Sequence, residues 1–436
     1  MGTNEKNMTT GSPGKLIITF AIPLMLGNIF QQFYTMADTM IVGQVVGVEA
    51  LAAVGAGDWL VWLVLGIMTG ITQGFSILVS QYYGAGEKEN LKCAVAKSYI
   101  MTALLSVVVL AVSEGTVYHV LLFLQTPDNV IDLTMLYLRL IFAGIPIIAA
   151  YNIFAAILRA LGNSRSPLIA MTVAAVINVG LDLLFVAVFG WGVAGAAVAT
   201  VIAQGFSALY CLLVLRKIRD IRLEKEDFYR QPSMSLRLLK LGTPLAIQNV
   251  IISVGGLTVQ YVINGFGFLF VAGFTATNKL YGILEMAAVS YGYAITTYVG
   301  QNLGAKKIER IKKGYHAALV LDLCFAVLAF VVIETLHTQI SSLFLGKDGT
   351  ALAYQVSGDY MRWLGYFFIF MGIKMATDGV LRGLGIMRPF LIANMVNLAI
   401  RLSVALICAP RFGIAFVWLA VPAGWLANFL ISYAAL

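Results

Sequence analysis

Charged residues are scarce in this sequence. Only 11% of its 436 residues are Asp, Glu, Lys or Arg, whereas about 25% is usual in soluble domains. Hydrophobic residues make up 60% of the chain, and the mean hydropathy is +0.88. This balance excludes a water-soluble globular protein of this length and predicts an all-α polytopic membrane protein.

Histidine and paired cysteine are scarce as well. The three histidines lie far apart in the predicted topology, and the four cysteines form no C-x-x-C pair. Neither an H-E-x-x-H nor a G-x-S-x-G element occurs. These absences argue against an intramembrane enzyme and give no sign of a metal or disulfide site, so we expect no enzymatic activity and no cofactor.

Between the apolar spans, long polar stretches are absent, with one exception. The exception, residues 216–237, is predicted to be a cytoplasmic linker between an N-terminal lobe at 1–215 and a C-terminal lobe at 238–436. Each lobe is expected to contain six transmembrane helices, since about twenty apolar residues suffice to cross a bilayer. The twelve predicted spans are 16–46, 52–82, 94–114, 130–158, 167–189, 193–215, 238–262, 270–298, 315–335, 355–381, 389–409 and 413–435.

The basic residues concentrate in the even-numbered connections between these spans. They include Lys88, Arg165 and a run from Arg216 to Lys240, whereas the odd-numbered connections hold mainly acids such as Glu49. Positively charged loops remain on the cytoplasmic side, so we expect both termini to be cytoplasmic. Membrane topology therefore explains the net charge of +8, and we expect no nucleic-acid partner.

The two halves of the sequence resemble each other. Pro244 follows Pro23 by 221 residues and Gln301 follows Gln81 by 220. The element LRALG at 158–162 recurs as LRGLG after 223 residues. Six helices per repeat give both copies the same orientation, so we predict two pseudo-symmetric lobes around a central cavity that rock against each other.

Two acids lie inside predicted spans of the N-terminal lobe. Asp38 shares a helix face with Gln31, and Asp182 lies one turn after Asn178. A charge in a membrane span costs at least about 2.5 kcal/mol, so such residues indicate a functional site. Counted from the cytoplasmic ends, both acids fall in the outer half of the membrane, where they can meet.

Neighbouring spans offer further oxygen atoms to this pair. Thr200 lies on the sixth span and Asn152 on the fourth. Either a proton shared by the carboxylates or a sodium ion held by carboxylate, amide and hydroxyl oxygens would change the charge of the pocket. Pro23 predicts a kink below Asp38, and we treat a gating role for it as a hypothesis.

The C-terminal lobe carries acids and bases together. Glu285 and Asp378 are candidates for a substrate cavity, and Asp322 is a third buried acid. Lys279, Lys374 and Arg401 are available as ion-pair partners. Both interpretations, functional acids and structural ion pairs, stay open at this point.

The motifs GNIFQQFYTMADTMIVGQVVG (27–47), SQYYGAG (80–86), GQNLGA (300–305) and the twin LRALG and LRGLG elements resemble the multidrug and toxic compound extrusion (MATE) transporters. The resemblance spans nearly the whole chain and is nearest the DinF-like branch. It implies an antiporter of the inner membrane that exports organic, often cationic, compounds against protons or sodium. It also implies a coupling site at Asp38, Asn178, Asp182 and Thr200, with Gln31 and Asn152 beside it.

Other interpretations remain. Arg401 occupies the repeat position of Asn178, so an anionic or zwitterionic substrate is an alternative. A flippase for lipid-linked sugars shares the superfamily, and a channel is not excluded by composition. A major-facilitator carrier is disfavoured because the connection GAGEKENLK lacks its motif. We expect membrane lipids and small organic compounds as partners, and a monomer.

Overall fold

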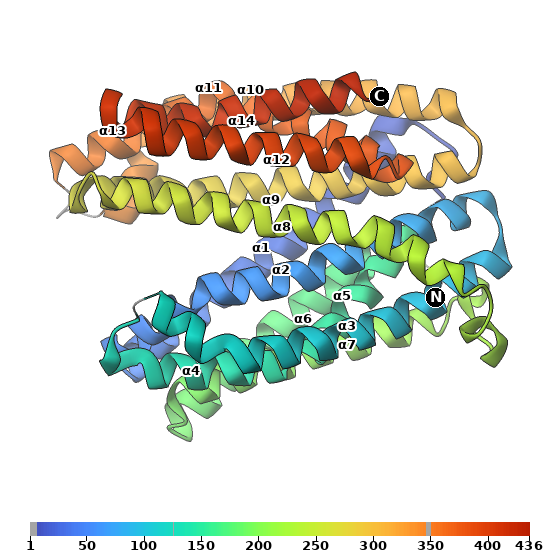
Figure 1. The fold of residues 1–436 in the computed structure, drawn as a ribbon, viewed down its shortest axis with the longest axis horizontal. Coiled ribbons are helices and arrows are strands. Elements are labelled where there is room, and N and C mark those ends of the chain that lie inside the picture. The colour runs from blue at the N-terminus through green and yellow to red at the C-terminus, as the bar shows by residue number, and fades with distance from the viewer. Residues whose placement is uncertain (1–6, 125, 346–349) are drawn as a thin grey trace. The chain divides into compact units, whose positions relative to one another are not determined.

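The computed structural model describes residues 7–124, 126–345 and 350–436, and this part of the chain contains helices and no strands (Figure 1). The all-α prediction is therefore confirmed. The helices of the first half are α1 (Pro13–Val45), α2 (Val48–Ala85), α3 (Lys88–Phe123), α4 (Asp128–Ala143), α5 (Ile145–Ala160), α6 (Arg165–Asp182), the π-helical turn η1 (Leu183–Val188) and α7 (Gly192–Leu215).

Two short 3₁₀ turns lead into the second half. The remaining elements are η2 (Arg219–Ile221), η3 (Lys225–Phe228), α8 (Ser233–Asn264), α9 (Phe268–Gly304), α10 (Ile308–Leu345), α11 (Ala351–Leu384), α12 (Met387–Ser403), η4 (Val404–Cys408), α13 (Ala409–Phe412) and α14 (Ala415–Ala434). Every predicted span lies on one helix or on consecutive helical segments. Within the described residues, ten helices are long and apolar enough to cross a membrane, or eleven if α4 and α5 form one span. With 37 residues, α9 is the remaining helix of comparable length.

The span predicted as a single helix at 130–158 is two helices. α4 and α5 are bent by 47° at Gly144. Pro146 falls in the first turn of α5, where its missing N–H is tolerated, so a new helix starts there. Gly144 also allows α7 to come close, because a Cβ atom at this position would lie 2.4 Å from Cγ2 of Val201.

The chain divides into two compact units. The first consists mainly of Ile22–Val250, and the second mainly of Ile251–Leu303 and Lys307–Leu436. Thr10–Ala21 belongs to the second unit, so α1 and α8 each contribute residues to both units. These units are defined by how compactly their residues pack, which does not test where the lobes begin and end. The predicted lobe boundaries at 215 and 238 therefore stay a prediction.

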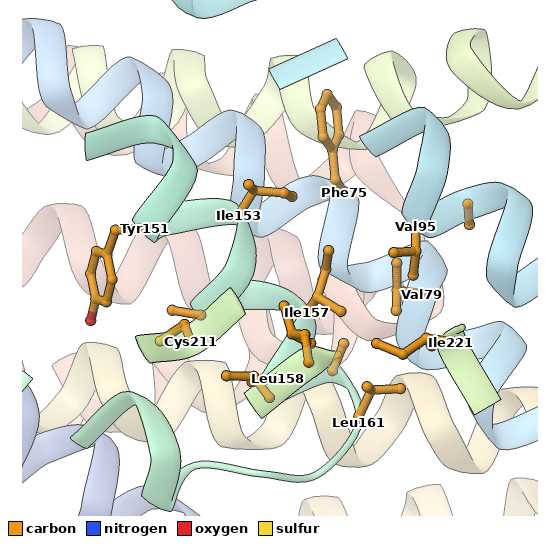
Figure 2. Close-up of a cluster of buried hydrophobic side chains, with 14 of the residues drawn as sticks. Phe75, Val79, Val95, Tyr151, Ile153, Ile157, Leu158, Leu161, Cys211 and Ile221 are labelled. Carbon is orange, nitrogen blue, oxygen red and sulfur yellow. The ribbon is translucent and has the colours of Figure 1, made fainter. Parts of the chain in front are cut away.

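The linker belongs to the first unit and packs against its helices. Ile218 and Ile221 are buried and join a core made by α2, α3, α5 and α7. Figure 2 shows Ile221 near Val79 and Val95, with Ile157 and Leu161 of the α5 region in the same cluster. The linker is polar in composition, like a segment exposed to solvent. Its buried side chains, Ile218 and Ile221, nevertheless fix it to the neighbouring helices.

The second unit has a core of stacked aromatic rings. Tyr360 of α11 stacks on Trp418 of α14 with ring centroids 4.3 Å apart, and Phe274 of α9 stacks on both. A second stack joins Tyr281 and Trp425. Such rings bury large areas and fix the spacing of α9, α11 and α14.

Glycines of α2 bring it into backbone contact with the first part of α8. A Cβ atom on Gly70 would lie 2.6 Å from the backbone nitrogen of Ala246, and one on Gly74 would lie 2.3 Å from Cα of Gly242. Close helix contacts of this kind are a major source of stability in membranes, where lipid solvates apolar side chains as well as protein does.

We expect Gly74→Ala to lower the thermal unfolding temperature of the purified protein, because overpacking costs about 1–3 kcal/mol. Gly55→Ala is the matched control on the same helix, since a Cβ atom there meets nothing within 4 Å. Unfolding followed by size-exclusion chromatography after heating compares the two variants. Equal unfolding temperatures would contradict the backbone contact.

Candidate functional site

A buried polar cluster lies in the first unit, on α1, α6 and α7. Asp38 is 6% exposed, while Asn178 and Asp182 are fully buried. Thr200 lies on α7 and precedes Val201, the residue that packs closely against Gly144. These four residues, which the sequence analysis singled out, form what we call the carboxylate cluster.

The end of α6 positions two of its members. Asn178 and Asp182 lie one turn apart on the same face, and Asp182 is the last residue before the π-helical turn η1. A π-helical turn widens the helix by one residue and is frequent at functional sites. Gly195 of α7 packs against Phe185 in this turn, so α6 and α7 are closely spaced here.

Side-chain contacts join the members of the cluster. The amide Nδ2 of Asn178 donates to Oγ1 of Thr200 at 3.4 Å. The Thr200 side chain is also a hydrogen-bond neighbour of the Asp38 carboxylate, and the charges of Asp38 and Asp182 act on each other. The structure thus brings together all four predicted residues from three helices.

Several oxygen atoms of the cluster receive no hydrogen bond from the part of the chain that the structure describes. They are Oδ1 of Asp38, Oδ1 of Asn178 and both carboxylate oxygens of Asp182. Buried polar atoms are almost always paired, so a group of four without donors is unusual. The set consists of hard oxygen ligands, which suit a proton or an alkali-metal cation.

The charged neighbours of the cluster are also acidic. Asp58 lies within electrostatic reach of the Asp38 carboxylate, and Asp38 lies within reach of the Asp182 carboxylate. No group of three or more His, Cys, Asp or Glu side chains in the described residues could hold a metal ion. The donor set therefore fits a monovalent cation better than a transition metal.

Three further residues extend the cluster, and sequence reasoning missed them. Tyr34 accepts a hydrogen bond at 3.0 Å from Nε2 of Gln204, and Tyr137 of α4 lies within electrostatic reach of Asp38 and Asp182. Tyr34 precedes Asp38 by four residues, and Gln204 follows Thr200 by four. That spacing places each pair on one helix face and could have found two of the three.

The other first-unit candidates lie differently. Gln31 is a hydrogen-bond neighbour of Tyr34, which links it to the cluster. Asn152 is half-buried on α5, and no hydrogen bond to the cluster is found within the described residues. Pro23 lies inside the continuous helix α1, two residues after the point where α1 passes from the second unit to the first.

The acids of the second unit have basic neighbours. Lys374 forms a buried ion pair with Asp378, with Nζ and Oδ2 3.0 Å apart, and Ser432 donates to the other oxygen of Asp378 at 3.0 Å. Glu285 accepts from the hydroxyl of Tyr281 at 3.4 Å and is within electrostatic reach of Arg401. The side chain of Lys279 lies outside the described residues.

Asp322 is an exception in this unit. It is 4% exposed, lies against the backbone of Gly372 on α11, and its Oδ2 atom has no hydrogen-bond partner among the described residues. The two units therefore differ in chemistry: the first gathers carboxylates, and the second pairs most of its buried acids with bases.

Comparison with known proteins identifies the family. The MatE family model matches residues 23–184 and 244–407, once in each half of the chain. The chain belongs to the MatE family. The two matched segments also coincide with the internal repeat seen in the sequence, and the chain is a multi-pass membrane protein of a transporter family.

Curated relatives in the MatE family cover most of the chain. A probable multidrug resistance protein YpnP from Bacillus subtilis is 29% identical over 90% of this chain and 87% of its own. A probable multidrug resistance protein NorM from Thermotoga maritima is 25% identical over 91% of this chain and 86% of its own. A FAD transporter from Shewanella oneidensis is 24% identical over 84% and 80%.

Solved structures of MATE proteins share the fold. A MOP superfamily transporter from Pyrococcus furiosus, described as having a binding pocket of reverse polarity, superposes with a TM-score of 0.91 at 22% identity, covering 98% of this chain and 96% of that one. A MATE family transporter in an outward-facing conformation gives 0.90 at 23% identity and the same coverage. The fold is that of the MATE transporters, with twelve helices in two lobes, as predicted.

We expect Lys374→Met to destabilise the protein by about 3–5 kcal/mol, because it leaves the Asp378 carboxylate buried without its partner. The double variant Lys374→Met, Asp378→Asn should recover most of that loss. Thermal unfolding of the two variants in detergent measures the difference.

The exposed ion pair of Lys88 with Asp220, at 2.8 Å, supplies the control. Lys88→Met should change stability by less than about 1 kcal/mol. A double variant at Lys374 and Asp378 no more stable than Lys374→Met alone would contradict the pairing.

Proposed function

We propose that this protein is a secondary multidrug efflux transporter that exports organic, often cationic, compounds by antiport with protons or sodium through alternating access. One observation carries the proposal: a MatE-family chain holds, inside its membrane spans, a cluster of buried carboxylate and amide oxygens that receive no hydrogen bond from the described residues. We assign cation coupling to Asp38, Asn178, Asp182 and Thr200.

The physical argument rests on charge in a medium of low dielectric constant. A carboxylate that is buried without a donor has lost its hydration and gained little in return. Binding a proton or sodium ion neutralises it, and release restores the charge. One unit charge that crosses 100 mV gains about 2.3 kcal/mol, which supports roughly a fifty-fold concentration gradient of substrate.

The helix that carries Asp38 also offers a place to bend. Pro23 has no N–H to donate, so α1 lacks one backbone hydrogen bond close to the boundary between the two units. Proline is a usual cause of a helix kink. We propose that a change of bend at Pro23 couples the occupancy of the cluster to alternating access.

A second candidate concerns the charge of the substrate. Arg401 and Lys374 lie among the buried groups of the second unit, beside Glu285 and Asp378. One relative is named a FAD transporter, and one structural neighbour is described as having a pocket of reverse polarity. These observations favour compounds with an anionic group as additional substrates, with Glu285 and Asp378 as cavity residues.

We propose the cytoplasmic membrane as the location, with both termini on the cytoplasmic side, because the basic connections should remain there. The flippase alternative is not favoured, since the relatives that cover most of the chain are named multidrug resistance proteins. Efflux of a soluble dye, compared with movement of a labelled lipid between leaflets, separates the two functions.

We expect Asp38→Asn and Asp182→Asn each to reduce dye efflux from proteoliposomes at least tenfold, because each removes a charge that the coupling ion must neutralise. Asp132→Asn is the control, since this acid is exposed on α4, outside the cluster. Undiminished efflux by either cluster variant, at equal protein incorporation, would rule out the assigned coupling site.

Thr200→Val should distinguish the two coupling ions. Under an imposed sodium gradient we expect the variant to need about tenfold more sodium for half-maximal efflux, because a neutral oxygen ligand worth about 1.4 kcal/mol is lost. Under a pH gradient it should keep at least half of the unmodified rate, because a proton needs only the carboxylates. An unchanged sodium requirement, in a protein driven by sodium, would remove Thr200 from the site.

A further inference from the structure

A groove in the first unit plays no part in the proposed transport cycle. Its volume is about 970 Å³, at the upper end of the range of about 300–1,000 Å³ that is usual for ligand sites. We call it the linker groove, because residues of the segment 216–228 form part of its lining. Apolar and aromatic side chains dominate its walls, among them Tyr99, Ala103, Phe154, Leu212, Ile218 and Leu223.

The part of the lining that the linker contributes is rich in basic side chains. Arg216, Lys217, Arg219 and Arg222 all contribute to the lining and are exposed. Three of the linker's four acids are engaged elsewhere. Asp220 pairs with Lys88 at 2.8 Å, Glu224 pairs with Lys92 at 3.6 Å, and Asp227 accepts from the backbone N–H of Glu224 at 2.8 Å. In the part of the chain that the structure describes, no salt bridge involves the four basic residues, so an anion from outside the protein can bind them.

A polar atom lies deeper in the same groove. Thr102 is 3% exposed, lines the groove, and its Oγ1 atom has no hydrogen-bond partner among the described residues. The nearby Ser106 hydroxyl is already bonded to the carbonyl of Ala103 at 2.8 Å.

This combination of groups matches one kind of molecule. A phospholipid combines an anionic phosphate, ester oxygens and acyl chains, and the groove combines basic residues, a hydroxyl that has no partner among the described residues, and apolar walls. Basic pockets between transmembrane helices bind the headgroups of anionic lipids. A soluble anion would leave the apolar walls unused, and a zwitterionic lipid would neutralise fewer of the basic residues.

We propose that the linker groove binds an anionic phospholipid, with its phosphate on Arg216, Arg219 and Arg222, an ester oxygen accepting from Thr102, and an acyl chain between α3, α5 and α7. The bound lipid then fills the space between the linker and the helices. The groove is separate from the carboxylate cluster, so this inference does not depend on the assigned coupling site.

The test is native mass spectrometry of the purified full chain with equimolar phosphatidylglycerol and phosphatidylethanolamine of the same acyl chains. We expect at least tenfold preferential retention of phosphatidylglycerol. The variant R216Q/R219Q/R222Q should lower this ratio to near one, because each basic residue near a membrane surface contributes a several-fold gain in affinity. The matched control R165Q/K313Q/R388Q removes three exposed bases elsewhere and should keep the ratio.

A second pair of variants tests the apolar part. Ala103→Trp fills the groove and should abolish retention of both lipids, whereas Leu104→Trp, on an exposed residue outside the groove lining, should not. Thr102→Val should lower retention several-fold. Excess glycerol 3-phosphate should not displace the lipid.

Three results would overturn the proposal. The first is an unchanged ratio of retained phosphatidylglycerol to phosphatidylethanolamine in the R216Q/R219Q/R222Q variant, or an equal fall of that ratio in the R165Q/K313Q/R388Q control. The second is retention by Ala103→Trp. The third is displacement by glycerol 3-phosphate, which would show a site for phosphate alone.

Discussion

The low dielectric constant of the bilayer interior is the constraint on which this structure depends. It forces the chain into helices, which satisfy their own backbone groups, and it makes hydroxyls such as those of Thr72 and Ser98 bond back to helix carbonyls. Against this background, a polar atom without a partner is expensive. The carboxylate cluster concentrates such atoms at one place in the first unit, and that concentration, rather than any single acid, distinguishes it from structural polar contacts.

The two halves of the repeat differ in how their buried polar groups are neutralised. In the first unit Asn178 and Asp182 offer acceptors and no positive charge. In the second unit Arg401 stands at the repeat position of Asn178, near Glu285, and Lys374 neutralises Asp378 at 3.0 Å. A duplicated scaffold thus combines a region of buried carboxylates with one in which two of the three candidate acids, Glu285 and Asp378, have basic neighbours. The fold is symmetric, while its chemistry is not.

Much of the fold could be predicted from the sequence, because a hydrophobic run long enough to span a bilayer has few alternatives. The spacing of Asn178 and Asp182, one helical turn, likewise placed them together. The contacts of Tyr34 and Gln204 were not predicted, since they depend on how α1 and α7 are rotated about their axes. The burial of Ile221 was not predicted either, because the scattered apolar residues of this polar segment show no sustained periodicity.

The bend between α4 and α5 has a consequence beyond its own helices. At Gly144 the absent side chain makes room for Val201, the residue that follows Thr200 on α7. The close approach of α5 and α7 beside Thr200 therefore depends on a position that carries no side chain. A search confined to polar side chains would overlook Gly144, although a larger residue there would push against the helix that carries Thr200.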